Sequence, residues 1–459
     1  MKPFAFNPRS LPAATEVAVG FCLVLAFSLL GSSRASPLAL TLVESSGLPA
    51  LGLGLWGLWE GRAAGTRKFA LFILAAAAVL PLIQLVPLPV EVWASLPGRA
   101  VELAILKAAG VQPGPMPLSL TPDATLHSLL ALIPAAAVFV ASLGLSIGAR
   151  TRLAWLIIAF GGINIAISLL QTAGGPFSPL EFYNRDVVGS TLGLFANPDH
   201  EADFLACAIP LAIAVSHSRS ARHRGGASVQ LEPAWLIVPA LVMGVFITRS
   251  RAGLILAAMG LAGALALRPA RRRRTTSLEP RAVVLVAAVG ALIVVALLAD
   301  RIPALARFHD QGADLRFTSL PYTFAAIRRF WPAGAGFGSF VPVFQMFEPA
   351  SLVDGVYFNR AHDDFLEILV EGGVASLLIL IAFLVWFARE AWSVWRGASD
   401  ARSSPLARAG TLVVLMILVH SSVDYPIREG AIACLFALAC ALLVPSSELP
   451  AASRMPGAA

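Results

Sequence analysis

Continuous apolar runs of about 20 residues recur along the whole chain, and short polar segments separate them. A run of that length can cross the hydrocarbon core of a bilayer as a helix. A chain in lipid must pair its own backbone groups, and only helices and closed barrels do so. Barrel strands alternate in polarity, whereas these runs are continuous, so the pattern predicts an all-α, polytopic integral membrane protein.

The runs predict about twelve transmembrane helices. We expect them at 15–31, 38–58, 69–88, 124–146, 153–172, 200–216, 233–248, 252–267, 282–299, 366–388, 409–420 and 429–445. The eleventh run is short for a membrane span unless its helix begins near Pro405.

One polar segment, residues 300–365, is much longer than the others. It is rich in aromatic residues, Gly and Arg, so it is neither low-complexity sequence nor a simple linker. It divides the chain into a transmembrane region at 1–299, this long loop, and a second transmembrane region with a tail at 366–459. A shorter polar segment contains an amphipathic stretch at 97–109, which we expect to lie at the membrane interface.

Composition agrees with this class of protein. Hydrophobic residues make up 57% of the 459 positions and charged residues only 13%, where soluble domains carry about 25% charged residues. The four cysteines all lie inside apolar runs without metal or redox spacing, which indicates small core residues. The segment after the first run, "SSRAS", loosely resembles a signal-peptide cleavage site, but the distribution of charge favours a retained helix.

The basic residues are distributed unevenly between alternate loops. The two termini and the loops after even-numbered spans hold 21 of the 34 Lys and Arg residues, including the run "RPARRRR". Cytoplasmic loops carry such an excess, so both termini are predicted to be cytoplasmic and the 300–365 loop to lie outside. The net charge of +7 is explained by this topology, and we expect no nucleic-acid partner.

Several polar clusters interrupt the apolar chain, and the predicted topology sends all of them to the outer face. Ionisable groups near membrane depth are costly and usually mark function. The candidate binding or catalytic residues in these clusters are Asn197, Arg249, Arg251, Arg316, Arg328, Arg360, His362, Asp363, His420 and Asp424.

Each cluster also has a purely structural interpretation. Arg249 and Arg251 resemble side chains that snorkel to the interface, and Asp363 or Asp364 resembles a helix cap. The "GAGFGSF" segment resembles a phosphate-binding loop, but no βα unit surrounds it, so a tight turn is favoured. "HDD" is weak evidence for a divalent ion, and we expect no metal. The gathering of five clusters on one face favours a functional site.

The residue types in these clusters suit a phosphorylated ligand. Guanidinium groups bind phosphate through paired donors and keep their charge, and fixed cations stabilise a departing diphosphate. Histidine accepts a proton from a hydroxyl near neutral pH. ATP and nucleotide sugars are cytoplasmic, so a transferase that faces outward needs a donor already activated on a lipid.

Residues from about 190 to 375 resemble the O-antigen ligase family, also called Wzy_C, of bacterial polysaccharide ligases and polymerases. The matching segments are "GLFANPDHEADFLA", "ITRSRAGLILA", "DLRFTSLPYTFAAIRRFWPAGAGFGSF" and "AHDDFLEILVEGG", followed outside that region by "LVHSSVDYPIREGAIA". The resemblance implies a GT-C-like membrane glycosyltransferase that acts at the periplasmic face of the inner membrane. It implies an undecaprenyl-diphosphate-linked donor, a sugar-hydroxyl acceptor, inversion at the anomeric centre, and neither metal nor cofactor.

The resemblance also implies roles for individual residues. Arg251 and Arg249 would hold the diphosphate, Arg316 would be a second phosphate ligand, His362 the general base, and Asn197 part of the pocket wall. The family often has Asn where Asp363 stands here. Two roles for Asp363 are open, because it either orients His362 or only caps the following helix.

Four functions compete at this point. A ligase would use lipid A core as the acceptor, whereas a polymerase would use another lipid-linked repeat, and both need the same donor site. A transporter or flippase would place polar residues near the bilayer midplane, and a non-catalytic scaffold would bind polysaccharide-assembly proteins. The ionisable residues are expected to gather on one face, which favours the enzyme. Its expected partners are membrane lipids, the donor and the acceptor.

Overall fold

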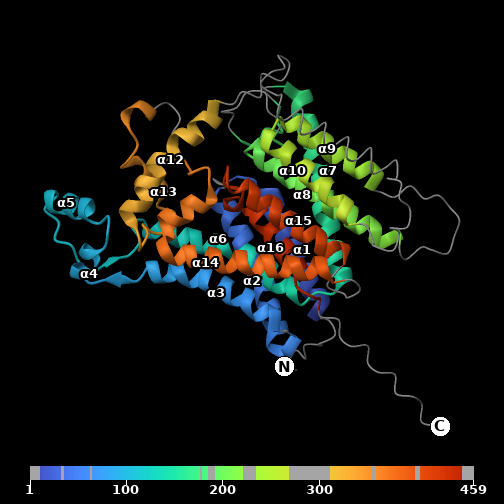
Figure 1. Ribbon diagram of the computed structural model, residues 1–459, viewed down its shortest axis with the longest axis horizontal. Coiled ribbons are helices and arrows are strands. Elements are labelled where there is room, and N and C mark those ends of the chain that lie inside the picture. Colours follow the sequence, from blue (N-terminus) through green and yellow to red (C-terminus); the bar gives the residue numbers. More distant parts are fainter. Residues whose placement is uncertain are drawn as a thin grey trace, which may run out of the picture.

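Helices make up nearly all the regular structure of the protein in the computed structural model (Figure 1). The structure describes residues 11–32, 36–62, 65–175, 178–183, 192–220, 234–267, 311–353, 358–397 and 404–446. The helices are α1 (Leu11–Leu29), α2 (Pro37–Gly57), α3 (Gly65–Gln84), α4 (Val90–Ser95), α5 (Ala100–Ala108), α6 (Pro122–Leu143), α7 (Ile147–Gly174), α8 (Pro198–Ser220), α9 (Ala234–Thr248), α10 (Arg251–Ala266), α12 (Gln311–Phe330), α13 (Phe340–Gln345), α14 (Asp364–Arg396), α15 (Pro405–His420) and α16 (Gly430–Leu443). Short π- and 3₁₀-helical turns are η1 (Leu58–Arg62), η6 (Ala350–Leu352) and η8 (Pro426–Arg428).

Each predicted span inside the described residues coincides with a helix, and the ninth, at 282–299, lies outside them. Two boundaries differ from the prediction. Helix α14 continues to Arg396, well beyond 388, and α15 begins at Pro405, where Ser404 caps it by accepting a hydrogen bond from the Ala407 amide. The start of α15 is the one that the short eleventh run allowed for, whereas the end of α14 extends a span that was already long enough to cross a membrane.

Six helices in the described part of the chain are long and apolar enough to cross a membrane. They correspond to Leu11–Leu29, Pro37–Glu60, Arg67–Gln84, Pro122–Leu143, Ile147–Gly174 and Asp364–Arg396. Helices α9, α10, α15 and α16 are apolar but shorter. The protein is therefore an all-α membrane protein, while the number of twelve spans stays a prediction.

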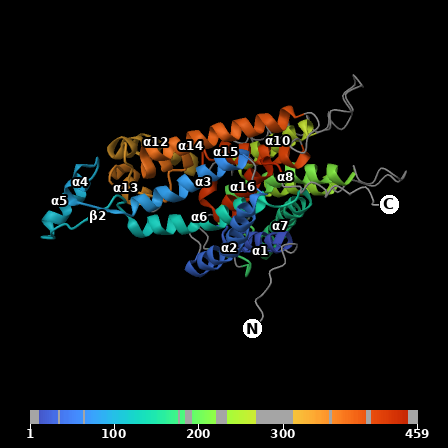
Figure 2. The same cartoon turned by 90° about the horizontal axis from the view of Figure 1, so that it is seen from below.

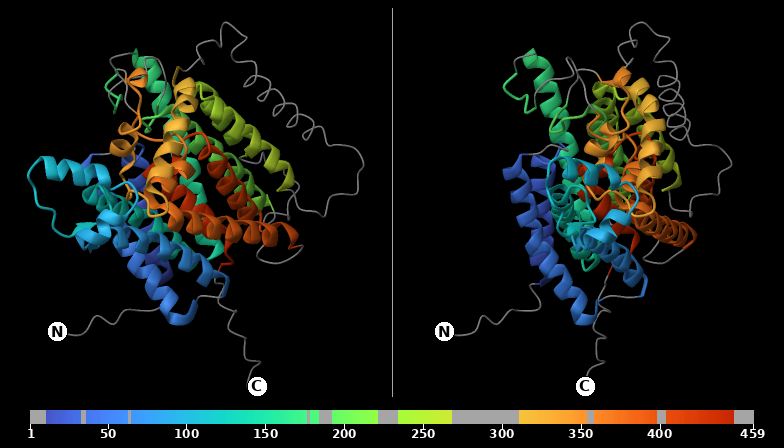
Figure 3. Two further views of the ribbon diagram at one scale, coloured as in Figure 1. Left: turned by 60° about the vertical axis from the view of Figure 1, so that its left-hand side comes forward. Right: turned by 90° about the vertical axis from the view of Figure 1, so that its left-hand side faces the viewer.

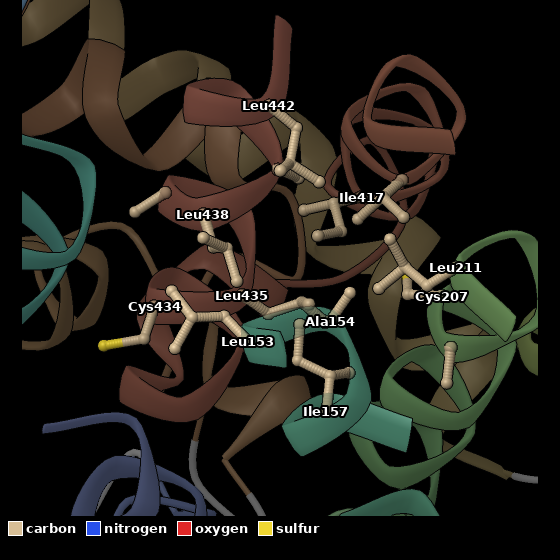
Figure 4. Close-up of a cluster of buried hydrophobic side chains, with 14 of the residues drawn as sticks. Leu153, Ala154, Ile157, Cys207, Leu211, Ile417, Cys434, Leu435, Leu438 and Leu442 are labelled. Atoms are coloured by element: carbon tan, nitrogen blue, oxygen red, sulfur yellow. The ribbon is translucent and has the colours of Figure 1, made fainter. Parts of the chain in front are cut away.

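One part of the hydrophobic core lies where α7, α8, α15 and α16 meet, and most of the side chains labelled there are aliphatic (Figure 4). Leu153 and Ile157 of α7 point toward Leu435 of α16, and Ile417 of α15 lies close by. Elsewhere glycine allows helices to approach closely. A Cβ on Gly54 of α2 would lie 2.7 Å from the Ala141 Cα of α6, so the small residue is required at this crossing.

The helix ends form two groups at opposite ends of the bundle. At one end, the Ala431 amide donates to the Leu30 carbonyl (3.1 Å) and the Asp364 amide to the Ser421 carbonyl (2.9 Å). At the other end, the Arg150 Nη1 donates to the Ala441 carbonyl (3.0 Å). Arg67 also lies at this second end, where it donates to the Pro445 carbonyl (2.8 Å), whereas the polar clusters lie at the first end.

Helices α4 and α5 project from the bundle beyond α3 and α6 (Figures 1 and 2). The segment around them is closed by a two-stranded antiparallel sheet, β1 (Pro87–Leu88) with β2 (Met116–Pro117). Helix α5 confirms the helix predicted at 97–109, and its location at a membrane interface stays a prediction. The buried Arg99 ties this projection to the rest of the protein, because its Nη2 donates to the Gly334 carbonyl (3.1 Å).

Candidate functional site

The polar clusters meet at the bundle end where α8 and α14 begin, α15 ends and Arg316 of α12 approaches. Figure 3 shows α12 lying beside the first part of α14 near the α15–α16 connection. Each of these elements contributes ionised side chains from its end. Helix ends suit this role because their terminal backbone groups leave the helix and can be capped by side chains.

Helix α8 brings three acid–base residues into the site from its first turns. The Asn197 Oδ1 accepts the Asp199 amide (2.8 Å), which is the geometry of a helix cap. The cap begins the helix so that His200 and Asp203 both face the interior and are fully buried. Asn197, predicted to shape the pocket, therefore acts as the residue that starts α8.

The connection between α15 and α16 enters the site from the opposite side. Helix α15 ends at His420, and Asp424 lies four residues later in a tight turn. Asp364, the first residue of α14, holds this turn in place. Its Oδ2 accepts hydrogen bonds from the Ser421 hydroxyl (2.9 Å) and the Ile427 amide (3.2 Å).

Asp424 is the centre of the cluster and is fully buried. Its Oδ1 lies 3.1 Å from His362 Nδ1. Its Oδ2 lies 3.7 Å from Arg316 Nη2, 3.8 Å from His200 Nε2 and 3.7 Å from His420 Nε2. Burial alone would raise the pKa of Asp424, but the His362 hydrogen bond and the surrounding cations hold it well below its usual range. Asp424 is therefore a permanent carboxylate.

His362 is the histidine of this cluster that reaches the surface, with 21% of its side chain exposed. Its φ of 50° is rare for a residue other than glycine, so the backbone is held in an unusual conformation. The Glu367 carboxylate supports this conformation by accepting the preceding Ala361 amide (2.9 Å). The arrangement fixes Nδ1 against Asp424 and leaves Nε2 directed away from that carboxylate.

The two other histidines form buried pairs with carboxylates. His200 Nδ1 lies 2.9 Å from Glu429 Oε2, and His420 Nδ1 lies 3.1 Å from Asp203 Oδ2. Tyr425 packs edge-on against both His200 and His362, with ring centroids 5.0 Å apart in each case. The site thus contains three histidines around one carboxylate.

Arg316 completes the cluster from α12. Its Nη2 donates to Asp199 Oδ2 (3.1 Å), and its Nη1 to the Val423 carbonyl (3.4 Å). Its side chain is 22% exposed, so Arg316, like His362, is only partly buried. The contacts bring Arg316, His362, His420 and Asp424 together, and their roles in binding or catalysis stay a prediction.

A second ionic cluster, formed by Arg428, Arg360, Glu367 and Glu371, lies next to the first. Arg428 Nη2 donates to Glu371 Oε2 (2.8 Å), and its Nη1 lies 3.2 Å from Glu367 Oε1. Burial would lower the pKa of Arg428, but these carboxylates and Asp364 raise it above its ordinary value, so Arg428 stays charged. Arg360 Nη1 also donates to Glu367 (2.9 Å). Arg360 therefore belongs to this supporting cluster.

The paired arginines Arg249 and Arg251 lie at the same bundle end, because α10 is parallel to α8. A Cβ on Gly253 would lie 2.3 Å from the Ala202 Cβ, which puts the start of α10 against the first turns of α8. Arg249 is exposed, with φ at 60°, and Arg251 is half-buried as the first residue of α10. They border the cluster without a direct contact to Asp424 or His362 among the described interactions.

Arg328 is not brought into the cluster. It is exposed in the last turn of α12, twelve residues after Arg316, which corresponds to about 18 Å along the helix axis. The helix that delivers Arg316 to the site necessarily carries Arg328 away from it.

The "HDD" and "GAGFGSF" segments have the structural roles that the sequence interpretation favoured. His362, Asp363 and Asp364 contact different partners. Asp363 Oδ1 accepts the Leu366 amide (2.9 Å) and so caps α14. In the glycine turn, the Gly336 and Gly338 amides donate to the Glu371 carbonyl and side chain (2.8 Å each). These amides therefore form hydrogen bonds within the protein, as the amides of a tight turn do.

The candidate residues did not include several central groups, namely Asp203, Glu429, Glu367 and Glu371. One signal could have found part of this set. Asp364, Glu367 and Glu371 recur at helical spacing in an otherwise apolar run, which puts three carboxylates on one face of a span. The pairing of His200 with Glu429 joins positions 229 apart, which a single sequence does not reveal.

The structure assigns Asp363 a capping role, which predicts a small effect of its removal. We expect Asp363→Ala to lower the free energy of unfolding by about 1 kcal/mol through loss of the cap. The His362–Asp424 contact does not involve Asp363, so we expect any activity to change less than about threefold. Thermal unfolding and a turnover assay on the same preparation check both values, and Asp363→Asn, which can also cap, is the matched control.

Fold and site together define a polytopic helical membrane protein with a histidine, arginine and carboxylate centre at one end of its bundle. The family model Wzy_C, described as O-antigen ligase, matches residues 236–381. This match, over about a third of the chain, supports the family that the sequence resemblance predicted. The matched segment includes Arg251, Arg316 and His362, whereas His200, His420 and Asp424 lie outside it. A search of curated proteins finds no match.

Proposed function

We propose that the protein is a membrane glycosyltransferase that transfers a saccharide from an undecaprenyl-diphosphate-linked donor to a sugar hydroxyl. The observation that carries the proposal is the His362–Asp424 contact (3.1 Å) with Arg316 Nη2 3.7 Å from the same carboxylate. In this contact an imidazole and a guanidinium lie beside the same carboxylate at the end of an apolar bundle. The family assignment supports ligase or polymerase chemistry on lipid-linked glycans.

In the proposed reaction, His362 Nε2 takes the proton of the acceptor hydroxyl as its oxygen attacks the anomeric carbon. A new carbon–oxygen bond forms there, and the bond to the diphosphate oxygen breaks with its electron pair passing to the diphosphate. Asp424 stabilises the imidazolium that results, because it faces Nδ1. Arg316, Arg251 and Arg249 stabilise the charge on the departing diphosphate. Attack on the face opposite the leaving group would invert the anomeric centre.

We place the site at the periplasmic face of the inner membrane, with both termini in the cytoplasm. The separation of Arg67 and Arg150 at one end of the bundle from the polar clusters at the other supports this orientation. The same separation argues against a transporter or flippase, whose substrate site would lie near the midplane. The GT-C-like architecture and the span number of twelve belong to this proposal as well.

Lipid A core is the acceptor that the ligase description of the family favours, and a second lipid-linked repeat is the polymerase alternative. The donor site is common to both. Reconstitution separates them: purified protein in liposomes receives the lipid-diphosphate donor with either lipid A core or a second donor molecule. Mass spectrometry of the products then identifies the acceptor.

Arginine variants test the site in that assay. We expect Arg316→Ala and Arg251→Ala each to lower transfer by about 100-fold, because each removes a cation from the developing diphosphate charge. Arg329→Ala is the matched control, since Arg329 is exposed in the last turn of α12. Unchanged transfer in both site variants, with normal protein levels, would contradict the proposed function.

A further inference from the structure

The two buried histidines, His200 and His420, differ from His362 in what faces their second nitrogen. His200 has Glu429 at Nδ1 (2.9 Å) and Asp424 at Nε2 (3.8 Å). His420 has Asp203 at Nδ1 (3.1 Å) and Asp424 at Nε2 (3.7 Å). Each buried ring therefore lies between two carboxylates, whereas His362 faces a carboxylate only through Nδ1.

This geometry favours the doubly protonated form of the two buried rings. A neutral imidazole carries one proton, so one of its nitrogens would direct a lone pair at a carboxylate. In a fully buried site that repulsion is not screened by water. A doubly protonated ring avoids it at both nitrogens, because each N–H then faces an oxygen.

The charges of the cluster come close to balance if both buried rings are doubly protonated. Four carboxylates meet here, those of Asp199, Asp203, Asp424 and Glu429, and Arg316 is the permanent cation among them. With His200 and His420 charged, the cluster carries one negative charge in excess while His362 is neutral. Uptake of one proton by His362 makes the cluster neutral.

The remaining titratable groups around these rings do not change this balance. Burial and the nearby Asp424 raise the pKa of Tyr425 to about 12, so its hydroxyl stays neutral. The Cys207 thiol donates to Asp203 (3.4 Å) from the next turn of α8. Arg360 and Asp363 flank His362 along the chain but are engaged with Glu367 and the Leu366 amide, and Arg251 begins the neighbouring α10.

We infer that His200 and His420 are positioning residues that stay doubly protonated, hold Asp424 as a carboxylate, and leave His362 as the imidazole that takes the acceptor's proton. The protonation of the two buried rings follows from the contacts alone. Their effect on proton transfer rests on the proposed function. Neither ring is exposed, so neither touches substrate.

Nitrogen NMR of protein labelled with ¹⁵N-histidine tests the protonation without any substrate. Of the seven histidines, two are expected to give imidazolium signals that persist above about pH 8, where ordinary histidines are neutral. His200→Gln and His420→Gln should each remove one of these signals. Neutral signals for both rings at about pH 7 would overturn the inference while leaving the proposed transferase intact.

The pH profile of transfer gives the second test. His200→Gln removes a buried positive charge, which favours protonation of His362, so the acid limb of the profile should move up by about one pH unit. Asp199→Asn removes a negative charge and should move the limb down. A fall in rate without these opposite shifts would mean that the histidines serve only the fold. Wild-type protein that transfers no saccharide at any pH would instead overturn the proposed function, and the NMR result would still stand by itself.

Discussion

Replacing His362 with asparagine is expected to lower saccharide transfer by about 10²–10⁴-fold, the usual contribution of a positioned general base. Asparagine is the appropriate substitute because the φ of 50° at this position is better tolerated by Asn than by most residues with a side chain. The amide can still approach Asp424 but cannot take the acceptor's proton. The loss should therefore appear in the chemical step.

Single-turnover kinetics on protein already loaded with donor measures that step directly. We expect donor affinity to change little, because the phosphate-binding groups of the proposal are arginines. Asp363→Asn is the neighbouring control, since it changes the charge next to His362 and leaves the Asp424 contact in place. If His362→Asn retained more than about a third of the wild-type rate, the general base would have to be another residue.

Replacing Arg428 with methionine is expected to give the largest loss of stability. Its guanidinium is 14% exposed and contacts Glu371, Glu367 and, at 3.7 Å, Asp364. Removing one partner of a buried ion pair costs about 3–5 kcal/mol, because the remaining charges stay buried without compensation. Arg360 would be left as the cation of a cluster with three carboxylates.

Unfolding in detergent by heat or denaturant measures this effect. Arg152→Met is the matched control, because the Arg152 side chain is 64% exposed and pairs with Glu16 at the bundle surface, where ion pairs contribute little. The double variant Arg428→Met with Glu371→Gln should recover part of the loss, since it removes one of the uncompensated carboxylates. Equal stability of Arg428→Met and wild type would show that water reaches this cluster.

The fold was largely predictable because lipid leaves a chain few alternatives. A run such as 124–146 must be a helix if it crosses a bilayer, and α6 occupies this region. The differences lie at helix ends, where composition changes gradually. Helix α14 carries Arg389 and Arg396 in its last turns, and a hydropathy pattern ends before such residues while the helix continues.

Only those features of the site that show in neighbouring residues of the sequence were predictable. His362, Arg316 and Asp424 stand out because ionisable residues are rare in an apolar chain, and the structure brings them into contact. The partners of His362 and Asp363 could not be deduced. Adjacent residues suggested a His–Asp pair, but the backbone turns between them, so that Asp424, 62 positions away, occupies the place beside the imidazole.

The position of Arg428 near the end of the chain has a consequence for biosynthesis. Glu367 and Glu371 are translated 57 or more residues before the guanidinium that neutralises them. Arg360 precedes Glu367 and donates to it, so until residue 428 has been made this group of carboxylates holds one guanidinium where the finished chain holds two. The last connection of the chain therefore completes the charge balance of a helix that was synthesised well before it.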